Sequence, residues 1–75
     1  MYEVRVSFKS VEDIQEFHNI ISKFNADVDV IKGTYIVDAK SFMGLMTIDY
    51  STPVIIKINS SDLSLRKKIE KWIIK

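Results

Sequence analysis

The sequence predicts an α+β fold in which three helices cover one face of a four-stranded sheet. Four short segments alternate apolar and polar residues, the pattern of strands with one buried face. Three others carry apolar residues three and four positions apart, the pattern of helices with one buried stripe. The resulting order is β-α-β-β-α-β-α. We therefore expect a two-layer, open-faced sandwich whose antiparallel or mixed sheet leaves its second face in water.

The first strand and the first helix have the clearest signals. Apolar side chains alternate with polar ones over residues 2–8. Ser10 precedes Glu12 and Asp13, which is typical of a helix start because the hydroxyl accepts a backbone N–H and the acids oppose the positive dipole end. A helix should therefore begin at Val11. Its buried stripe contains Ile14, Phe17, Ile21 and Phe24.

The middle of the chain predicts a hairpin followed by a short helix. Residues 28–30 and 35–38 alternate as two strands, and Gly33 supplies the turn because glycine adopts positive φ without a steric penalty. Ser41 is a second capping serine, and the helix after it carries Phe42, Leu45 and Met46 at helical spacing. This helical segment covers only the eight residues 41–48 and cannot turn every apolar side chain inward. Some of these side chains should therefore stay exposed.

The end of the chain predicts a fourth strand and a final helix. Residues 49–53 form a loop, since Pro53 cannot donate to a central ladder, and residues 54–58 alternate again. Several possible caps lie in 59–62, before a helix that ends in Lys71 and Lys75. Its buried stripe contains Leu65, Ile69, Trp72 and Ile73.

Composition narrows the class of protein. The 75 residues allow a single domain over 1–75, 47% of them are apolar, and cysteine is absent. The net charge of +1 argues against a nucleic-acid partner. No apolar run approaches the roughly 20 residues of a membrane span. One histidine and no cysteine predict no metal site, and no cofactor is implied. We expect a cytoplasmic protein.

Two stretches of the chain carry a family resemblance. Residues 22–28 and, above all, 38–46 resemble HPr, the small phosphocarrier of the bacterial sugar phosphotransferase system. In that family the second stretch has the form Lys-Ser-hydrophobic-Met-Gly-hydrophobic-Met. The matching positions here are Lys40, Ser41, Met43, Gly44 and Met46. The resemblance implies a single HPr-like domain with a four-stranded antiparallel sheet in the order 1-4-2-3.

The chain departs from the family at the phosphate-carrying histidine. The family carries that residue at the start of the first helix, followed by Ala-Arg-Pro. Ser10 stands at the histidine position here, followed by Val11, Glu12 and Asp13. Two unit charges about 4 Å apart at a dielectric near 20 interact by about 4 kcal/mol. The two acids would therefore oppose a phosphoryl group, and we expect no catalytic residue and no enzymatic phosphotransfer.

His18, the only histidine, offers a weaker route to phosphotransfer. It lies well inside the first helix, away from the N–H groups of the helix start. An ordinary histidine at the helix surface is the simpler interpretation. The basic residues of the final helix, Arg66, Lys67, Lys68, Lys71 and Lys75, similarly predict a solvated face rather than an RNA-binding one.

Ser41 is the candidate regulatory residue. In the HPr proteins of many Gram-positive bacteria the matching serine is phosphorylated by a dedicated kinase. Crh proteins lack the catalytic histidine but keep that serine, and this chain resembles them in that respect. A phosphoserine at a helix cap beside Lys40 is physically permissible. Ser41 either caps the helix alone or caps it and is also phosphorylated.

The residues around Ser41 are docking candidates. Partly exposed methionine and phenylalanine suit an adaptable protein-binding surface, and in HPr the corresponding region meets partner proteins. The candidates are Lys40, Phe42, Met43, Gly44 and Met46. The alternative is that these residues form an ordinary edge of the core.

Three functions follow from these patterns. The first is a non-catalytic docking module whose protein partners belong to the phosphotransferase system. The second is a Crh-like regulator switched at Ser41, with an HPr kinase and a transcription regulator as partners. The third is a small-molecule-binding domain of ferredoxin-like topology, which a sheet order of 4-1-3-2 would favour.

Overall fold

The computed structural model describes residues 1–74 and contains one antiparallel sheet. The strand order is β1-β4-β2-β3, as the resemblance predicts, and it differs from the 4-1-3-2 order of the ferredoxin-like alternative. The central strand β4 pairs with β1 and β2, so that Val4, Ile56 and Val30 lie side by side. The strands are β1 (Tyr2–Val6), β2 (Val28–Lys32), β3 (Tyr35–Asp38) and β4 (Val54–Ile58).

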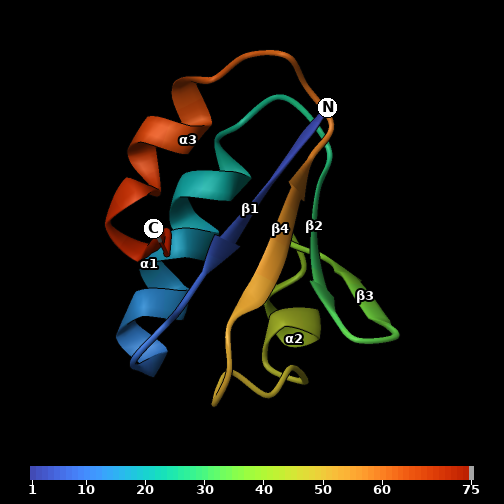
Figure 1. Cartoon of the computed structure of the whole chain (residues 1–75), viewed down its shortest axis with the longest axis vertical. Helices are drawn as coiled ribbons and strands as arrows, with labels where there is room; N and C mark the ends of the chain where they lie inside the picture. Colours follow the sequence, from blue (N-terminus) through green and yellow to red (C-terminus); the bar gives the residue numbers. More distant parts are fainter. Residues whose placement is uncertain (75) are drawn as a thin grey trace.

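The helices lie on one side of this sheet. Helices α1 and α3 run side by side against it, and α2 is set apart from α3 and packs against α1 and β3 (Figure 1). The described helices are α1 (Val11–Ser22), α2 (Phe42–Leu45), α3 (Ser64–Lys68) and the 3₁₀ segment η1 (Glu70–Trp72). The two serine caps place the starts of α1 and α2 where the sequence predicts them.

The core between the two layers is entirely apolar. Among residues 1–74 no polar or charged residue is buried. The ring of Phe8 packs against those of Phe17, Tyr50 and Trp72, with centroids 5.0, 5.5 and 5.5 Å away. This aromatic cluster joins the segment after β1, helix α1, the loop before β4 and η1.

The other face of the sheet is open, as the alternation predicts. Glu3, Arg5 and Ile36 are exposed on it, while Ile31 and Ile55 are half-buried. The register places Arg5 opposite Ile55, Ile55 opposite Ile31, and Ile31 opposite Ile36. Neighbouring side chains therefore shield one another across the strands although no second layer covers them.

The final helix is shorter than the sequence predicts. Helix α3 ends at Lys68, and after η1 the chain becomes extended at Ile73, with φ −72° and ψ 131°. Ile73 then forms an antiparallel bridge with Val6 on the free edge of β1. Backbone pairing with this edge competes with the continued helix, and helical spacing cannot reveal it. The predicted role of Lys75 lies outside the described residues.

The start of α3 is also built differently from a serine cap. Its first flanking residue, Leu63, makes no capping bond. Instead, the Asp62 carboxylate accepts the N–H of Ser64 at 2.9 Å. This hydrogen bond lowers the pKa of Asp62. Of the caps expected over 59–62, Asp62 is therefore the residue that binds the start of the helix.

Candidate functional site

The residues before α2 hold Ser41 in a defined position. Asp38, at the end of β3, accepts two N–H groups: that of Lys40 at its carboxylate and that of Ser41 at its carbonyl, each at 2.9 Å. Ser41 is exposed, and its Oγ accepts the N–H of Gly44 at 3.2 Å. Ser41 therefore caps α2 with its hydroxyl at the molecular surface.

His18 links the same segment to α1. Its Nε2 lies 3.0 Å from the carbonyl oxygen of Lys40. Its ring packs edge-on against Phe42, with centroids 5.3 Å apart at 68°. Since the Lys40 carbonyl only accepts, Nε2 carries the hydrogen in this contact. The half-buried His18 is thus a support for the Ser41 segment, a role that sequence reasoning missed because the contact crosses 22 positions.

The apolar side chains of α2 divide sharply between core and solvent. Leu45 is fully buried at 0% exposure, whereas Met43 is 82% and Met46 41% exposed. Phe42 is half-buried against His18. We call this surface the Ser41 patch. It consists of Lys40, Ser41, Phe42, Met43, Gly44 and Met46.

Gly44 has close neighbours inside the protein. A Cβ at this position would lie 3.2 Å from the Oγ of Ser41 and 3.5 Å from the Cβ of Val37. The first distance is too short for a relaxed contact, so a side chain here would push against the cap.

Side chains also satisfy the carbonyl groups at the other end of α2. The Thr47 hydroxyl donates to the Gly44 carbonyl, and the Tyr50 hydroxyl donates to that of Leu45, each at 2.7 Å. Burial raises the pKa of Tyr50 to about 12. Sequence patterns gave no sign of Tyr50, which lies in the loop before Pro53. These bonds hold a helix of one turn that has little intrinsic stability.

The Ser10 end of α1 is closed by the chain itself. The Ser10 Oγ accepts the N–H of Asp13 at 3.2 Å, and the Asp13 carboxylate accepts the N–H of Lys9 at 2.9 Å. This reciprocal arrangement resembles a capping box. Glu12 adds a second, exposed carboxylate. Both acids therefore lie beside the Ser10 hydroxyl, at the position where the resemblance predicts the loss of a histidine.

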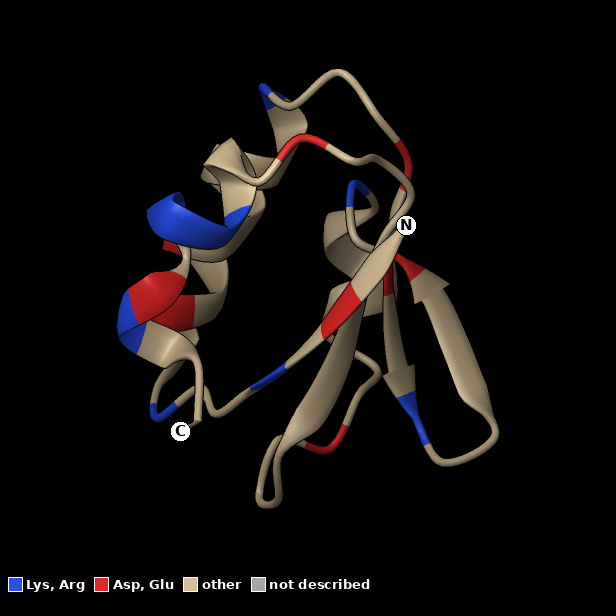
Figure 2. Ribbon diagram, turned by 45° about the horizontal axis from the view of Figure 1, so that its top comes forward, with Lys and Arg blue, Asp and Glu red and all other residues tan. Residues whose placement is uncertain are grey.

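Charge separates the two helix starts. Acidic residues gather at the start of α1 and basic ones on α3, while α2 carries no charge (Figure 2). Lys9 and Lys71 also line a shallow hollow beside Asp13, but Lys71 is paired with Glu16. Arg66, Lys67 and Lys68 are exposed on α3. An anion at Ser10 would meet two carboxylates, whereas α2 carries none and the Asp38 carboxylate before Ser41 is bound to the N–H of Lys40.

Residues 1–74 contain neither a membrane-spanning helix nor a cluster of metal ligands. No helix there is long and apolar enough to cross a bilayer. The same residues contain no group of three or more histidine, aspartate or glutamate side chains arranged to hold a metal ion.

Comparison with known proteins gives structural neighbours. No protein-family model matches this sequence, and no curated protein does. HPr-C-His from Thermoanaerobacter tengcongensis is similar in structure, with a TM-score of 0.79 and 24% identity over 95% of this chain and 89% of its own. The phosphocarrier protein HPr from Bacillus anthracis str. Ames has a TM-score of 0.74 and 25% identity over 97% and 94%. The chain thus has an HPr-like fold, and these neighbours support a relationship to the phosphocarrier family.

Proposed function

We propose that this protein is a non-catalytic docking module related to the phosphotransferase system, which binds partner proteins through the Ser41 patch and carries no phosphate on histidine. One observation carries the proposal. Met43 and Met46 stay 82% and 41% exposed beside the capping residue Ser41, while Ser10, which the resemblance places at the histidine position, lies beside two carboxylates. This combination of an exposed apolar patch and an acidic helix start supports docking rather than phosphate transfer.

The arrangement of α2 suits such a role. Exposed methionine side chains adapt their shape to different partners, because they rotate about several bonds and are polarisable. Leu45 anchors the helix from below, and His18 and Tyr50 bind its two ends through backbone carbonyls. A partner therefore meets adaptable side chains on a backbone that is held at both ends. The held backbone lowers the entropy cost of binding.

The test is a reconstituted phosphorylation reaction. The protein is incubated with phosphoenolpyruvate and the first enzyme of the phosphotransferase system, with an authentic HPr as positive control, and its mass is measured. We expect no added phosphoryl group. An acid-labile phosphoryl group that is lost in His18→Ala would overturn the proposal, because the protein would then be a carrier.

A second function, Crh-like regulation at Ser41, is supported by the exposure of this residue. Its hydroxyl accepts one N–H and keeps its own hydrogen available, and Lys40 is adjacent. With ATP and an HPr kinase, we expect a mass gain of one phosphoryl group. Ser41→Ala should abolish the gain, and Ser10→Ala, the matched change at the other cap, should not. A gain that persists in Ser41→Ala would remove this function.

A further inference from the structure

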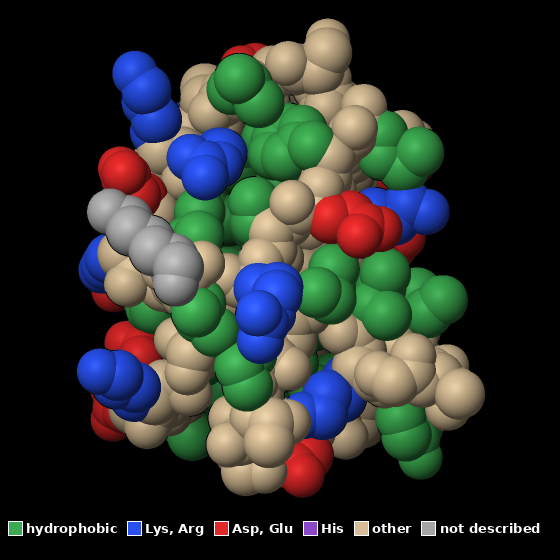
Figure 3. Space-filling model, viewed as in Figure 1, with side chains coloured by type: hydrophobic (Ala, Val, Ile, Leu, Met, Phe, Trp, Pro, Cys, Tyr) green, Lys and Arg blue, Asp and Glu red, His purple; other side chains and the backbone are tan. Residues whose placement is uncertain are grey.

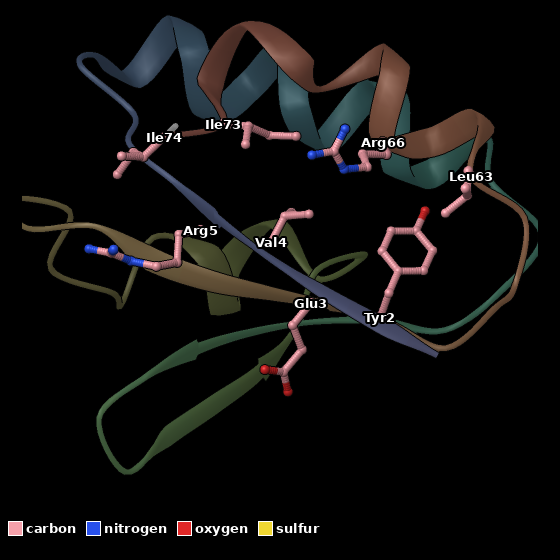
Figure 4. Close-up of a pocket in the computed structure, with 8 residues that line it drawn as sticks. All are labelled: Tyr2, Glu3, Val4, Arg5, Leu63, Arg66, Ile73 and Ile74. Atoms are coloured by element: carbon pink, nitrogen blue, oxygen red, sulfur yellow. The ribbon is translucent and has the colours of Figure 1, made fainter.

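A groove lies at the opposite edge of the sheet from the Ser41 patch. It has a volume of about 520 Å³ and runs between β1 and the segment that contains α3 and the residues after η1. Tyr2 and Val4 point into it from β1, Arg66 reaches toward them from α3, and Glu3 points away (Figure 4). Hydrophobic side chains are exposed along the same line between α3 and β1 (Figure 3).

One wall of this groove is a strand edge that already accepts a partner over part of its length. The N–H of Ser7 donates to the Trp72 carbonyl and the N–H of Ile74 to the Arg5 carbonyl, each at 2.9 Å. Glu3 lies two residues before Arg5 in the same strand, so its N–H and carbonyl point to the same side. Within residues 1–74, neither group of Glu3 has a backbone partner on that side.

The other wall supplies apolar contact and one cation. Leu63 is 58% exposed, and the Tyr2 hydroxyl closes this end by donating to the Asp62 carbonyl at 2.9 Å. Arg66 is exposed at the middle of the groove, and no described carboxylate forms an ion pair with it. Its neighbours Lys67 and Lys68 make the surroundings positive.

We propose that this groove binds an extended acidic segment of a partner protein, which adds to β1 as a further strand and places a carboxylate on Arg66. The N–H and carbonyl of Glu3, which have no backbone partner among residues 1–74, call for an extended backbone, as in strand addition to a sheet edge. The partner segment needs an apolar side chain to contact Tyr2, Val4 and Leu63. It also needs a carboxylate for Arg66, two positions away from that apolar residue on the same face of the strand. This interaction goes beyond the Ser41 docking function and is independent of it.

The test uses the capped peptide Thr-Val-Thr-Asp-Thr-Val-Thr, which presents valine and aspartate on one face when extended. Its binding to the whole chain is followed by the NMR shifts of backbone amides. We expect the largest shift at the amide of Glu3. Arg66→Ala should weaken binding about fivefold, the size of one exposed ion pair. Lys67→Ala, which changes a cation outside the groove, should weaken binding much less.

Two control peptides separate the contribution of backbone pairing from that of the aspartate. A version with N-methyl groups on the amides that would pair with β1 should not bind, and a version with lysine in place of aspartate should bind less tightly. The proposal is overturned if the Glu3 amide does not shift, if the N-methylated peptide binds equally well, or if Arg66→Ala behaves like Lys67→Ala. Concentration-dependent shifts at the same amides without peptide would also overturn it, because a second copy would then occupy this edge.

Discussion

The starts of α1 and α2 share one capping geometry but differ in charge. In each, a serine Oγ accepts the N–H of the third residue after it at 3.2 Å: Asp13 for Ser10 and Gly44 for Ser41. The aspartate turns back to bind Lys9, whereas Gly44 brings no carboxylate to the start of α2, where Lys40 and Asp38 lie just before the serine. In both helices the capping serine sets where the helix begins. The charges of the flanking residues then determine which ligands can bind at the start of the helix.

The two helices also differ in how many buried side chains hold them against the core. Helix α1 has 12 residues and buries Ile14, Phe17 and Ile21. Helix α2 has four residues and buries Leu45 alone. A short helix with one anchor presents most of its side chains outward, which makes α2 suitable as a contact surface and makes its position depend on few interactions.

The largest expected effect comes from removing that single anchor. Leu45→Ala should lower the free energy of unfolding by about 2–5 kcal/mol, because it leaves a cavity under α2. Urea denaturation measures the change. Met43→Ala, in the same helix but exposed, is the matched control and should change stability by less than about 0.5 kcal/mol. Equal losses in both variants would show that α2 is not anchored through Leu45.

The hydroxyl of Tyr50 gives a second way to disturb α2. Tyr50→Phe should lower the free energy of unfolding by about 1 kcal/mol, because the Leu45 carbonyl loses its donor. The pKa of Tyr50 is raised to about 12 in the folded protein and is about 10 in the unfolded chain. Between these values only the folded protein keeps the proton, so the wild type should lose stability as the pH rises from about 10 to about 12.

Urea denaturation at about pH 9 and about pH 11 checks this dependence. Part of the alkaline loss should remain in Tyr50→Phe, since burial also raises the pKa of Tyr2. The loss in the variant should nevertheless be smaller than in the wild type. An identical loss in both proteins would mean that Tyr50 ionises equally easily when folded and unfolded.

Replacing each capping serine with aspartate tests directly whether the flanking charges distinguish the two helix starts. Aspartate is as good a cap as serine, so Ser41→Asp should keep stability within about 0.5 kcal/mol of the wild type. Ser10→Asp places a third carboxylate beside Glu12 and Asp13 and should cost about 0.5–1 kcal/mol. Thermal or urea unfolding ranks the two variants. The reverse ranking would mean that flanking charge does not distinguish the two helix starts.

Removing charge at the start of α1 should have the smallest effect. Asp13→Asn keeps an oxygen for the N–H of Lys9 but loses the favourable charge at the helix dipole, which is worth about 0.3–1 kcal/mol. With Glu12→Gln as well, the amides near Ser10 should shift when inorganic phosphate is added. The wild-type amides should not. Equal shifts in both proteins would show that the acids do not exclude anions.

Local signals predicted most of the fold. The four strands follow from alternation, and both serine caps follow from their own sequence neighbours, so the starts of α1 and α2 were correct. The end of α3 was wrong, because the bridge between Ile73 and Val6 joins distant residues. Sequence spacing describes one segment at a time and therefore cannot weigh a helix against a strand edge elsewhere in the chain.

The candidate site was predicted only in outline. Matching positions in the resemblance located Lys40 to Met46, but not which of the side chains are exposed. In a helix of one turn the exposed and buried sides depend on the neighbouring β3 and α1. The support from His18 and Tyr50 was missed for the same reason, since each binds a backbone carbonyl that carries no sequence signature.

The pairing of β1 with β4 has a consequence for how the chain is made. A ribosome completes β1 first, yet the strand's main partner is the segment that places Ile58 opposite Tyr2. The nascent strand must therefore wait for this partner until β4, which begins at Val54, has been synthesised. During that wait Glu3 and Arg5, which interrupt its apolar residues, are the side chains that discourage it from joining the strand of another growing chain.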